Sequence, residues 1–181
     1  MIKQNRTIRI DLDDVMSDML GLWLLFYNDK YEDTVKPSDI KGWEISEYLP
    51  KCTATQAMEI IDLANFFRNV PPKPRAKLVI KRLRERGDRV VCCSAYTNAR
   101  QLADKEYWLK TFMGIERANT IFTTAKELVI ADIAIDDNIN NLIGFKGVRV
   151  LFTAPHNLTV TEGFDYRVND WFELETLLMS E

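Results

Sequence analysis

Two aspartates, Asp11 and Asp13, stand one residue apart at the end of a short run rich in β-branched residues, residues 7–12. A carboxylate held at a strand end can attack phosphorus and form an aspartyl-phosphate, which divides a difficult hydrolysis into two easier steps. In a chain with 27 acidic residues, such a pair on its own is most often a solvated surface feature. What the pair can do therefore depends on which other residues meet it.

Further polar residues follow or lie near the ends of other apolar runs. Ser94 follows residues 89–93, and Asp136 and Asp137 close residues 132–137. A carboxylate that approaches a dianionic phosphate is repelled unless a cation lies between them, and Mg²⁺ prefers a few carboxylates together with water and phosphate oxygens. Lys126 and the Ser94 hydroxyl could hold the remaining phosphate oxygens. Together these residues predict a magnesium-dependent phosphoryl-transfer site.

The elements that must position these residues alternate along the chain. Apolar runs predict strands at residues 7–12, 89–93, 132–137 and 148–153. Helical periodicity predicts helices at residues 75–86, 102–113 and 170–179. Such alternation is typical of an α/β protein whose largely parallel sheet is covered on both faces. Because sites in these folds lie outside the carboxyl ends of the strands, the polar residues are expected to meet at one edge.

Residues 16–72 interrupt the alternation with aromatic and helical segments and end at a proline-rich break. This stretch predicts a small helical cap inserted after the first strand. The remaining ranges, 1–15 and 73–181, then form the core, a three-layer Rossmann-like parallel sheet. Within the cap, Trp23 and Phe26 are expected to pack internally.

Composition limits the classes of partner. The chain has a net charge of −3 with both signs interleaved, which argues against a polynucleotide partner but leaves small anions open. The start of the sequence lacks the long apolar run of a secretion signal, and the apolar stretch at residues 20–27 is too short to span a bilayer. Three cysteines without regular spacing give neither a disulfide framework nor a zinc site. We expect a cytoplasmic protein with no membrane partner.

The order of these residues resembles the haloacid dehalogenase-like (HAD) phosphatase superfamily. Its four motifs are Asp-x-Asp, a Ser or Thr, a Lys and a paired Asp, which correspond here to Asp11-Leu12-Asp13, Ser94, Lys126 and Asp136-Asp137. The segments at residues 65–69, 126–137 and 151–157 resemble those of one branch, the 5′(3′)-deoxyribonucleotidases. The resemblance covers nearly the whole chain and implies a nucleoside monophosphate substrate, Mg²⁺ as cofactor and a homodimer.

The resemblance also implies a role for each matching residue. Asp11 would be the nucleophile and a metal ligand. Asp13 would protonate the leaving oxygen and later activate water, while its backbone carbonyl contacts the metal. Asp137 would ligate Mg²⁺ with support from Asp136, and Lys126 would neutralise the phosphate. In the cap, the positions that enclose the base and sugar correspond to Trp43, Phe67 and Met19. For Trp43 and Phe67, packing within the cap is the open alternative.

Several positions depart from the family pattern. Asp14 stands where Gly is usual, and Cys93 occupies a position usually held by Thr, so that Ser94 alone would keep a hydroxyl contact to phosphate. Thr124 stands where Arg is frequent, and Asn138 follows the paired aspartates. These changes leave the nucleophile, the acid and the metal ligands in place.

Three functions remain open from the sequence. The first is a nucleotidase acting on deoxynucleoside monophosphates. The second is a phosphatase of another small metabolite, such as a sugar phosphate, with the same core under a different cap. The third is a catalytically weak nucleotide-binding relative, which the departures at Asp14 and Cys93 suggest. The lone histidine, His156, is expected to hold a loop in place and not to act in catalysis.

Overall fold

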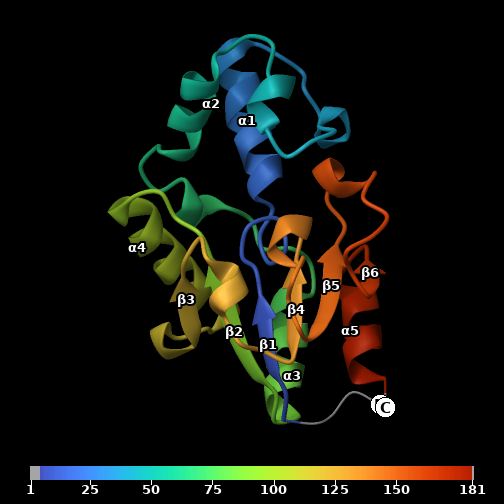
Figure 1. Ribbon diagram of the computed structural model, residues 1–181. Coiled ribbons are helices and arrows are strands. Elements are labelled where there is room, and N and C mark those ends of the chain that lie inside the picture. Colours follow the sequence, from blue (N-terminus) through green and yellow to red (C-terminus); the bar gives the residue numbers. More distant parts are fainter. Residues whose placement is uncertain (1–4, 181) are drawn as a thin grey trace.

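Six parallel strands form one sheet in the order β3-β2-β1-β4-β5-β6 in the computed structural model, which describes residues 5–180 (Figure 1). The strands are β1 (Thr7–Ile10), β2 (Arg89–Ser94), β3 (Thr120–Phe122), β4 (Ile133–Asp136), β5 (Val148–Phe152) and β6 (Tyr166–Val168). The predicted α/β class is confirmed. Strands β3 and β6 were not predicted, because three residues are too few to give a periodic signal. Residues 1–4 and 181 lie outside the described residues. All of them belong to the predicted core ranges, and residues 1–4 also belong to the stretch considered for a secretion signal.

Strand β1 lies at the centre, between β2 and β4. Ile10 is in register with Cys92 on one side and with Ile135 on the other. The chain winds outward through β2 and β3 and then crosses to β4, so the strand order reverses at β1. This is the topological switch point, where open α/β sheets bind their ligands.

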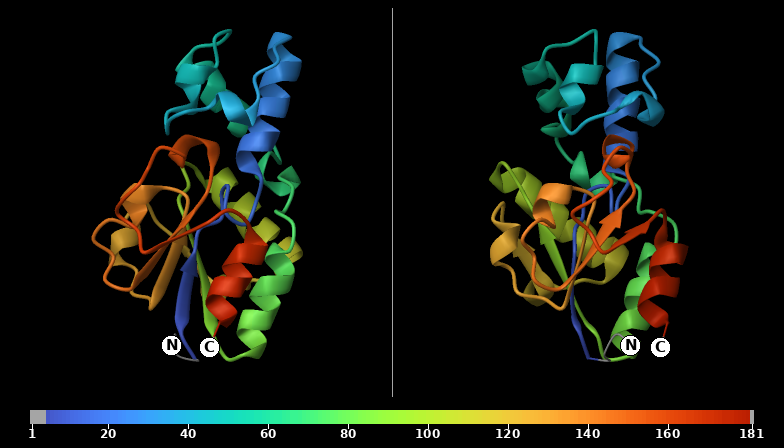
Figure 2. Two further views of the ribbon diagram at one scale, coloured as in Figure 1. Left: turned by 90° about the vertical axis from the view of Figure 1, so that its right-hand side faces the viewer. Right: turned by 45° about the vertical axis from the view of Figure 1, so that its right-hand side comes forward.

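The two faces of the sheet are covered differently. Helices α3 (Ala76–Glu85), α4 (Ala99–Trp108, continued by a π-helical turn, Leu109–Met113) and α5 (Trp171–Met179) bury the main core on one face (Figure 2). On the other face, Ala134, Leu142 and Leu151 form a small buried cluster. The 3-10 turn η5 (Arg117–Asn119) precedes β3, and between β3 and β6 the chain forms loops and the 3-10 turns η6 (Lys126–Leu128), η7 (Ile139–Asn141) and η8 (Pro155–Asn157), with no α-helix.

Above the carboxyl ends of the strands lies a helical cap (Figure 1). It contains α1 (Met19–Tyr31), α2 (Ala54–Ile61) and the 3-10 turns η1 (Pro37–Asp39), η2 (Ile45–Tyr48) and η3 (Phe67–Asn69). The cap has a buried apolar cluster of its own, separate from that of the sheet. Thr53 and Gln56 form a reciprocal capping box that starts α2. Among residues 5–180, no helix has the length and apolar character needed to cross a membrane.

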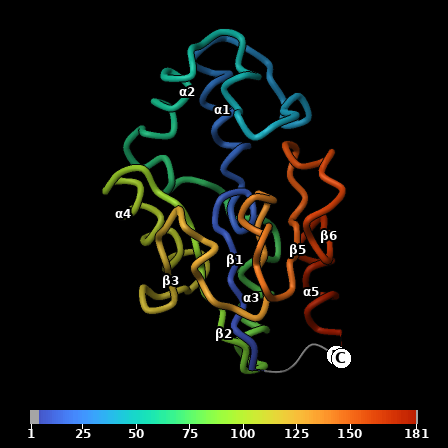
Figure 3. Tube along the Cα trace, viewed as in Figure 1, coloured from blue at the N-terminus to red at the C-terminus, as the bar shows by residue number. Residues whose placement is uncertain are grey.

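The chain passes between sheet and cap twice, once after β1 and once before α3 (Figure 3). The two passages run antiparallel, with a bridge between Ser17 and Pro72. The amide of Asp18 donates to the Pro71 carbonyl at 2.8 Å, and the amide of Lys73 donates to the Met16 carbonyl at 2.8 Å. These bonds lie at the two ends of the range predicted for the cap, residues 16–72.

Candidate active site

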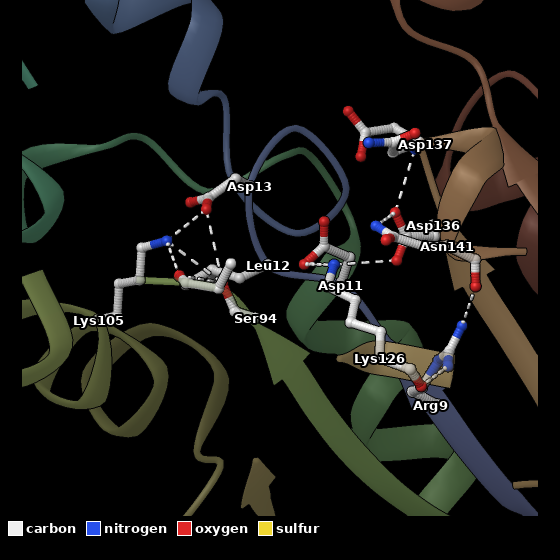
Figure 4. Close-up of polar contacts among 12 residues, drawn as sticks. Arg9, Asp11, Leu12, Asp13, Ser94, Lys105, Lys126, Asp136, Asp137 and Asn141 are labelled. Carbon is white, nitrogen blue, oxygen red and sulfur yellow. Dashed lines mark hydrogen bonds and ion pairs between the residues drawn. The ribbon is translucent and has the colours of Figure 1, made fainter. Parts of the chain in front are cut away.

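Three carboxylates meet where β1 and β4 end. Asp11 directly follows β1, while Asp136 is the last residue of β4 and Asp137 the next one. Each of the three offers one oxygen, and these oxygens all lie within 4.8 Å of one another (Figure 4). Alternation explains why Asp11 and Asp136 meet, because Ile10 and Ile135 are in register and point into the core, which leaves the next residue of each strand on the opposite side. Asp137 lies beyond the end of β4 and joins them from the loop that follows.

One lysine lies among these carboxylates. Lys126 Nζ is 2.8 Å from Asp11 Oδ1 and 3.0 Å from Asp136 Oδ2. Burial disfavours the charged form of Lys126, but Asp11 and Asp136 more than offset this and raise its pKa. Burial, followed by the charge of Asp11, raises the pKa of Asp136 to about 6 and that of Asp137 well above its usual value. The three carboxylates thus face a single ammonium.

The cluster fits a hard divalent cation. Asp137 Oδ1 is buried and has no hydrogen-bond donor among residues 5–180. Closely spaced carboxylate oxygens without enough donors are the ligands that Mg²⁺ takes in proteins. Asp11, Asp136 and Asp137 would hold the ion. The Asp13 carboxylate does not belong to this cluster, and the metal contact expected from the Asp13 backbone carbonyl stays a prediction.

Asp13 faces a second lysine on the other side of the site. Lys105 Nζ, on α4, donates to Asp13 Oδ2 at 2.5 Å, to the Ala95 carbonyl at 2.7 Å and to Ser94 Oγ at 3.3 Å (Figure 4). Burial raises the pKa of Asp13, with the ammonium of Lys105 opposing that shift. Lys105 was not predicted, because nothing in the sequence sets this helical lysine apart from the solvated ones.

Arg9 supports the cluster from below and was also missed. Its guanidinium donates to the Lys126 carbonyl at 2.5 Å and to the Asn141 carbonyl at 2.8 Å. Asn141 Nδ2 in turn donates to Asp136 Oδ1 at 2.9 Å. Arg9 therefore fixes η6 and η7, the two turns that bear on the carboxylates. Arg9 could have been noticed in the sequence, because it is a charged residue inside an otherwise apolar strand.

Two departures from the family pattern have a structural explanation. Asp14 adopts the left-handed conformation with φ 56°, which explains why Gly is usual there and which Asp tolerates better than most residues. Its carboxylate accepts a hydrogen bond from the Leu20 amide at 2.9 Å, at the start of α1. Burial raises its pKa to about 7. Cys93 and Ser94, the two residues expected near the phosphate on this strand, are both 0% exposed and absent from the cavity wall. Ser94 lies beside the acid, with its Oγ 3.5 Å from Asp13 Oδ2.

A cavity of about 460 Å³ opens between the cluster and the cap. The core contributes mostly polar residues: Asp11, Asp13, Asp14, Ala95, Thr124, Lys126, Asp137, Asn138, Asn141 and His156. The cap contributes a mostly apolar roof: Met19, Trp23, Trp43, Glu44, Ile45, Ser46, Met58 and Ile61. A polar floor under an apolar roof suits an anionic group attached to a flat apolar one.

The cap residues expected to enclose the substrate are placed differently from one another. Met19 and Trp43 line the cavity, and Trp43 is 53% exposed. Phe67 is 5% exposed, packs within the cap core and does not line the cavity. Trp23 packs internally as expected but also reaches the cavity wall.

His156 touches both cap and core. Its Nε2 lies 3.1 Å from Asp137 Oδ2 without hydrogen-bond alignment, and the centroid of its ring lies 5.0 Å from that of Trp43, with the two rings perpendicular. Burial lowers its pKa, which favours the neutral imidazole. His156 thus lies between the carboxylate cluster and the cap, and its role in holding a loop stays a prediction.

Comparison with known proteins decides the family. Residues 5–181 match the model of the family described as 5′ nucleotidase, deoxy (Pyrimidine), cytosolic type C protein. The chain belongs to this family. The 5′(3′)-deoxyribonucleotidase of Clostridium acetobutylicum is 38% identical over 96% of this chain and 95% of its own length. That of Bacillus subtilis is 33% identical over 96% of this chain and 99% of its own length.

Solved structures agree with the HAD-like fold of this nucleotidase family. A D,D-heptose 1,7-bisphosphate phosphatase from Burkholderia thailandensis has a TM-score of 0.60 at 12% identity and covers 98% of this chain and 100% of its own. A magnesium-bound HAD-hydrolase from Bacillus subtilis has a TM-score of 0.61 at 11% identity, covering 97% and 99%. At such identities the likeness concerns the fold. Family membership makes this chain a phosphoric monoester hydrolase.

Proposed function

We propose that the protein is a magnesium-dependent 5′(3′)-deoxyribonucleotidase that releases phosphate from deoxynucleoside monophosphates. One observation carries the proposal: a cluster of three carboxylates and one lysine, of which Asp11, Asp137 and Lys126 line the floor, lies at the base of a cavity whose roof is apolar and aromatic. The floor suits a phosphate and its cation, while the roof suits a base and sugar. The names of the relatives support the same substrate class.

The chemistry follows from the different surroundings of the two aspartates. When bound, Mg²⁺ would neutralise the phosphate and allow a carboxylate to approach it. Asp11 would attack phosphorus as the bond from phosphorus to the nucleoside oxygen breaks, giving an aspartyl-phosphate. Asp13, whose pKa burial raises, would give its proton to the departing oxygen. Asp13 would then take a proton from the water that hydrolyses the aspartyl-phosphate, and Asp11 and phosphate would be released.

The phosphate itself would contact Lys126 from the side of the carboxylates. The Ser94 hydroxyl lies 3.5 Å from Asp13 Oδ2 and would serve the opposite side. Trp43 and Met19 would cover the nucleoside. Catalysis in the cytoplasm and a homodimer stay predictions from the sequence.

The test is phosphate release from deoxyribo- and ribonucleoside 5′- and 3′-monophosphates and from several sugar phosphates, with Mg²⁺ and with chelator. We expect turnover of the deoxynucleotides, lost with chelator and in Asp11→Asn. A preference for sugar phosphates would overturn the role of the cap while leaving the core chemistry intact. Binding of nucleotides without any hydrolysis would overturn the enzymatic proposal.

A further inference from the structure

Phe67 lies outside the cavity but against the catalytic machinery. It begins η3, in the segment that returns from the cap to the core, and its side chain is buried. The centroid of its ring lies 4.5 Å from Lys105 Nζ. A base stacked in the cavity would not meet this ring, because Phe67 is absent from the cavity wall.

Lys105 is enclosed by oxygens and by this ring. The residue is 3% exposed, and its ammonium has three oxygen partners, on Asp13, Ser94 and Ala95. The ring of Phe67 adds a further contact to the ammonium. A cation over an aromatic face is attracted by the ring quadrupole, and the attraction grows when water is excluded.

The segment that carries Phe67 is bonded to the helix that carries Lys105. Arg68 Nε donates to Asp104 Oδ1 at 2.6 Å, and its guanidinium carbon lies 4.7 Å from the centroid of the Tyr107 ring. Trp108 Nε1 donates to the Val70 carbonyl at 2.7 Å. On one segment these contacts directly follow Phe67, and on the other they lie on both sides of Lys105, so the ring and the ammonium are held in a fixed relation.

We propose that Phe67 is a positioning residue that holds the Lys105 ammonium against the Asp13 carboxylate, and so aims the acid–base group at the leaving oxygen. The role rests on the proposed function of Asp13. It separates Phe67 from the cap residues that enclose the substrate. Weakening the contact should therefore slow the chemical step without weakening nucleotide binding.

Progressive fluorination of the Phe67 ring tests this directly. Fluorine withdraws charge from the ring face while nearly preserving its shape and apolar character, so it weakens attraction to a cation and little else. With mono-, di- and trifluorophenylalanine at position 67, we expect kcat to fall stepwise, by about tenfold over the series, with KM changed by less than about twofold.

Phe66 supplies the matched control. It is buried in the same cap cluster, its ring centroid lies 5.2 Å from that of Phe67, and it makes no cation contact within residues 5–180. The same substitutions at position 66 are expected to leave kcat unchanged. An equal fall in kcat at both positions would show that Phe67 acts only through packing, and would overturn the proposal.

A double-mutant cycle and a spectroscopic readout complete the test. Phe67→Leu should lower kcat in the wild-type background but not in Lys105→Met, whereas Phe67→Tyr should retain it. Independently of activity, the ring current of Phe67 should shift the Lys105 side-chain resonances upfield, and Phe67→Leu should remove that shift. A rise in KM at constant kcat, or an unshifted Lys105, would overturn the proposal. An enzyme inactive on every nucleotide would instead refute the proposed function.

Discussion

The two sides of the Asp-x-Asp pair differ in charge. On one side, which we term the carboxylate-rich half, Asp11, Asp136 and Asp137 surround Lys126, so three negative groups face one positive group (Figure 4). On the other, the balanced half, Asp13 faces Lys105 alone. Buried charges are costly unless paired, so the first half needs a further cation and the second does not. In the proposed mechanism, the site would thus separate metal binding from proton transfer within one short loop.

The largest expected effect is on catalysis in the carboxylate-rich half. Asp11→Asn removes the nucleophile and should lower kcat by roughly 10⁴-fold or more. Asp13→Asn removes the acid and base and should lower kcat by roughly 10²- to 10⁴-fold. Steady-state phosphate release measures both, with the exposed Asp29→Asn as control. A larger loss in Asp13→Asn than in Asp11→Asn would reverse the assignment of roles.

The second-largest expected effect is on Mg²⁺ affinity, which should differ between substitutions in the carboxylate-rich half and in the balanced half. Asp137→Asn removes a predicted ligand and should weaken Mg²⁺ binding by roughly 100-fold, as measured by isothermal titration calorimetry. Asp13→Asn should leave the affinity within a few-fold, because its carboxylate is bonded to Lys105. Comparable losses in the two variants would show that the halves are not separate.

The metal-free protein should show the charge excess in its stability. The pKa of Asp136 is raised from 3.8 to about 6, so the folded state holds its proton more tightly than the unfolded state. Stability from this group is therefore lost as the pH rises from about 4 to about 7. Mg²⁺ should offset the loss, and should raise Tm by several degrees more at pH 7.5 than at pH 5.

Differential scanning calorimetry with Mg²⁺ and with chelator measures this difference in Tm at each pH. Groups that titrate away from the carboxylate cluster affect both samples alike, so their contributions largely cancel in the difference. Asp137→Asn should raise Tm in chelator at pH 7.5 and remove the response to Mg²⁺. A response to Mg²⁺ that does not depend on pH would contradict the charge excess.

The smallest expected effect concerns the cap contact to the carboxylate-rich half. Trp43 meets His156, which touches Asp137, while Phe67 meets Lys105 in the balanced half. Because Trp43 lines the cavity, Trp43→Leu should raise KM by roughly 3- to 10-fold with kcat nearly unchanged. Trp43→Phe should recover most of the affinity. A fall in kcat alone would assign Trp43 a positioning role like that of Phe67.

Much of the carboxylate-rich half could be predicted from local pattern. Asp11, Asp136 and Asp137 each end an apolar run, and parallel strands bring such ends to one edge. The balanced half was only partly predictable. Lys105 lies 92 residues from Asp13 along the chain, and its helix shows no signal that sets this lysine apart. Cys93 and Ser94 were adjacent candidates, and only Ser94 comes near the acid.

The sequence by itself determined the α/β class, the strand that Asp11 follows and the approach of the three carboxylates, because strand periodicity is a local signal and a parallel sheet brings the carboxyl ends of its strands to one edge. Only the tertiary structure decided that Phe67 faces Lys105 while Trp43 faces the cavity. Both are aromatic residues of one cap, and the way the returning segment docks on α4 separates them. Such docking depends on contacts between distant segments, which no local pattern records.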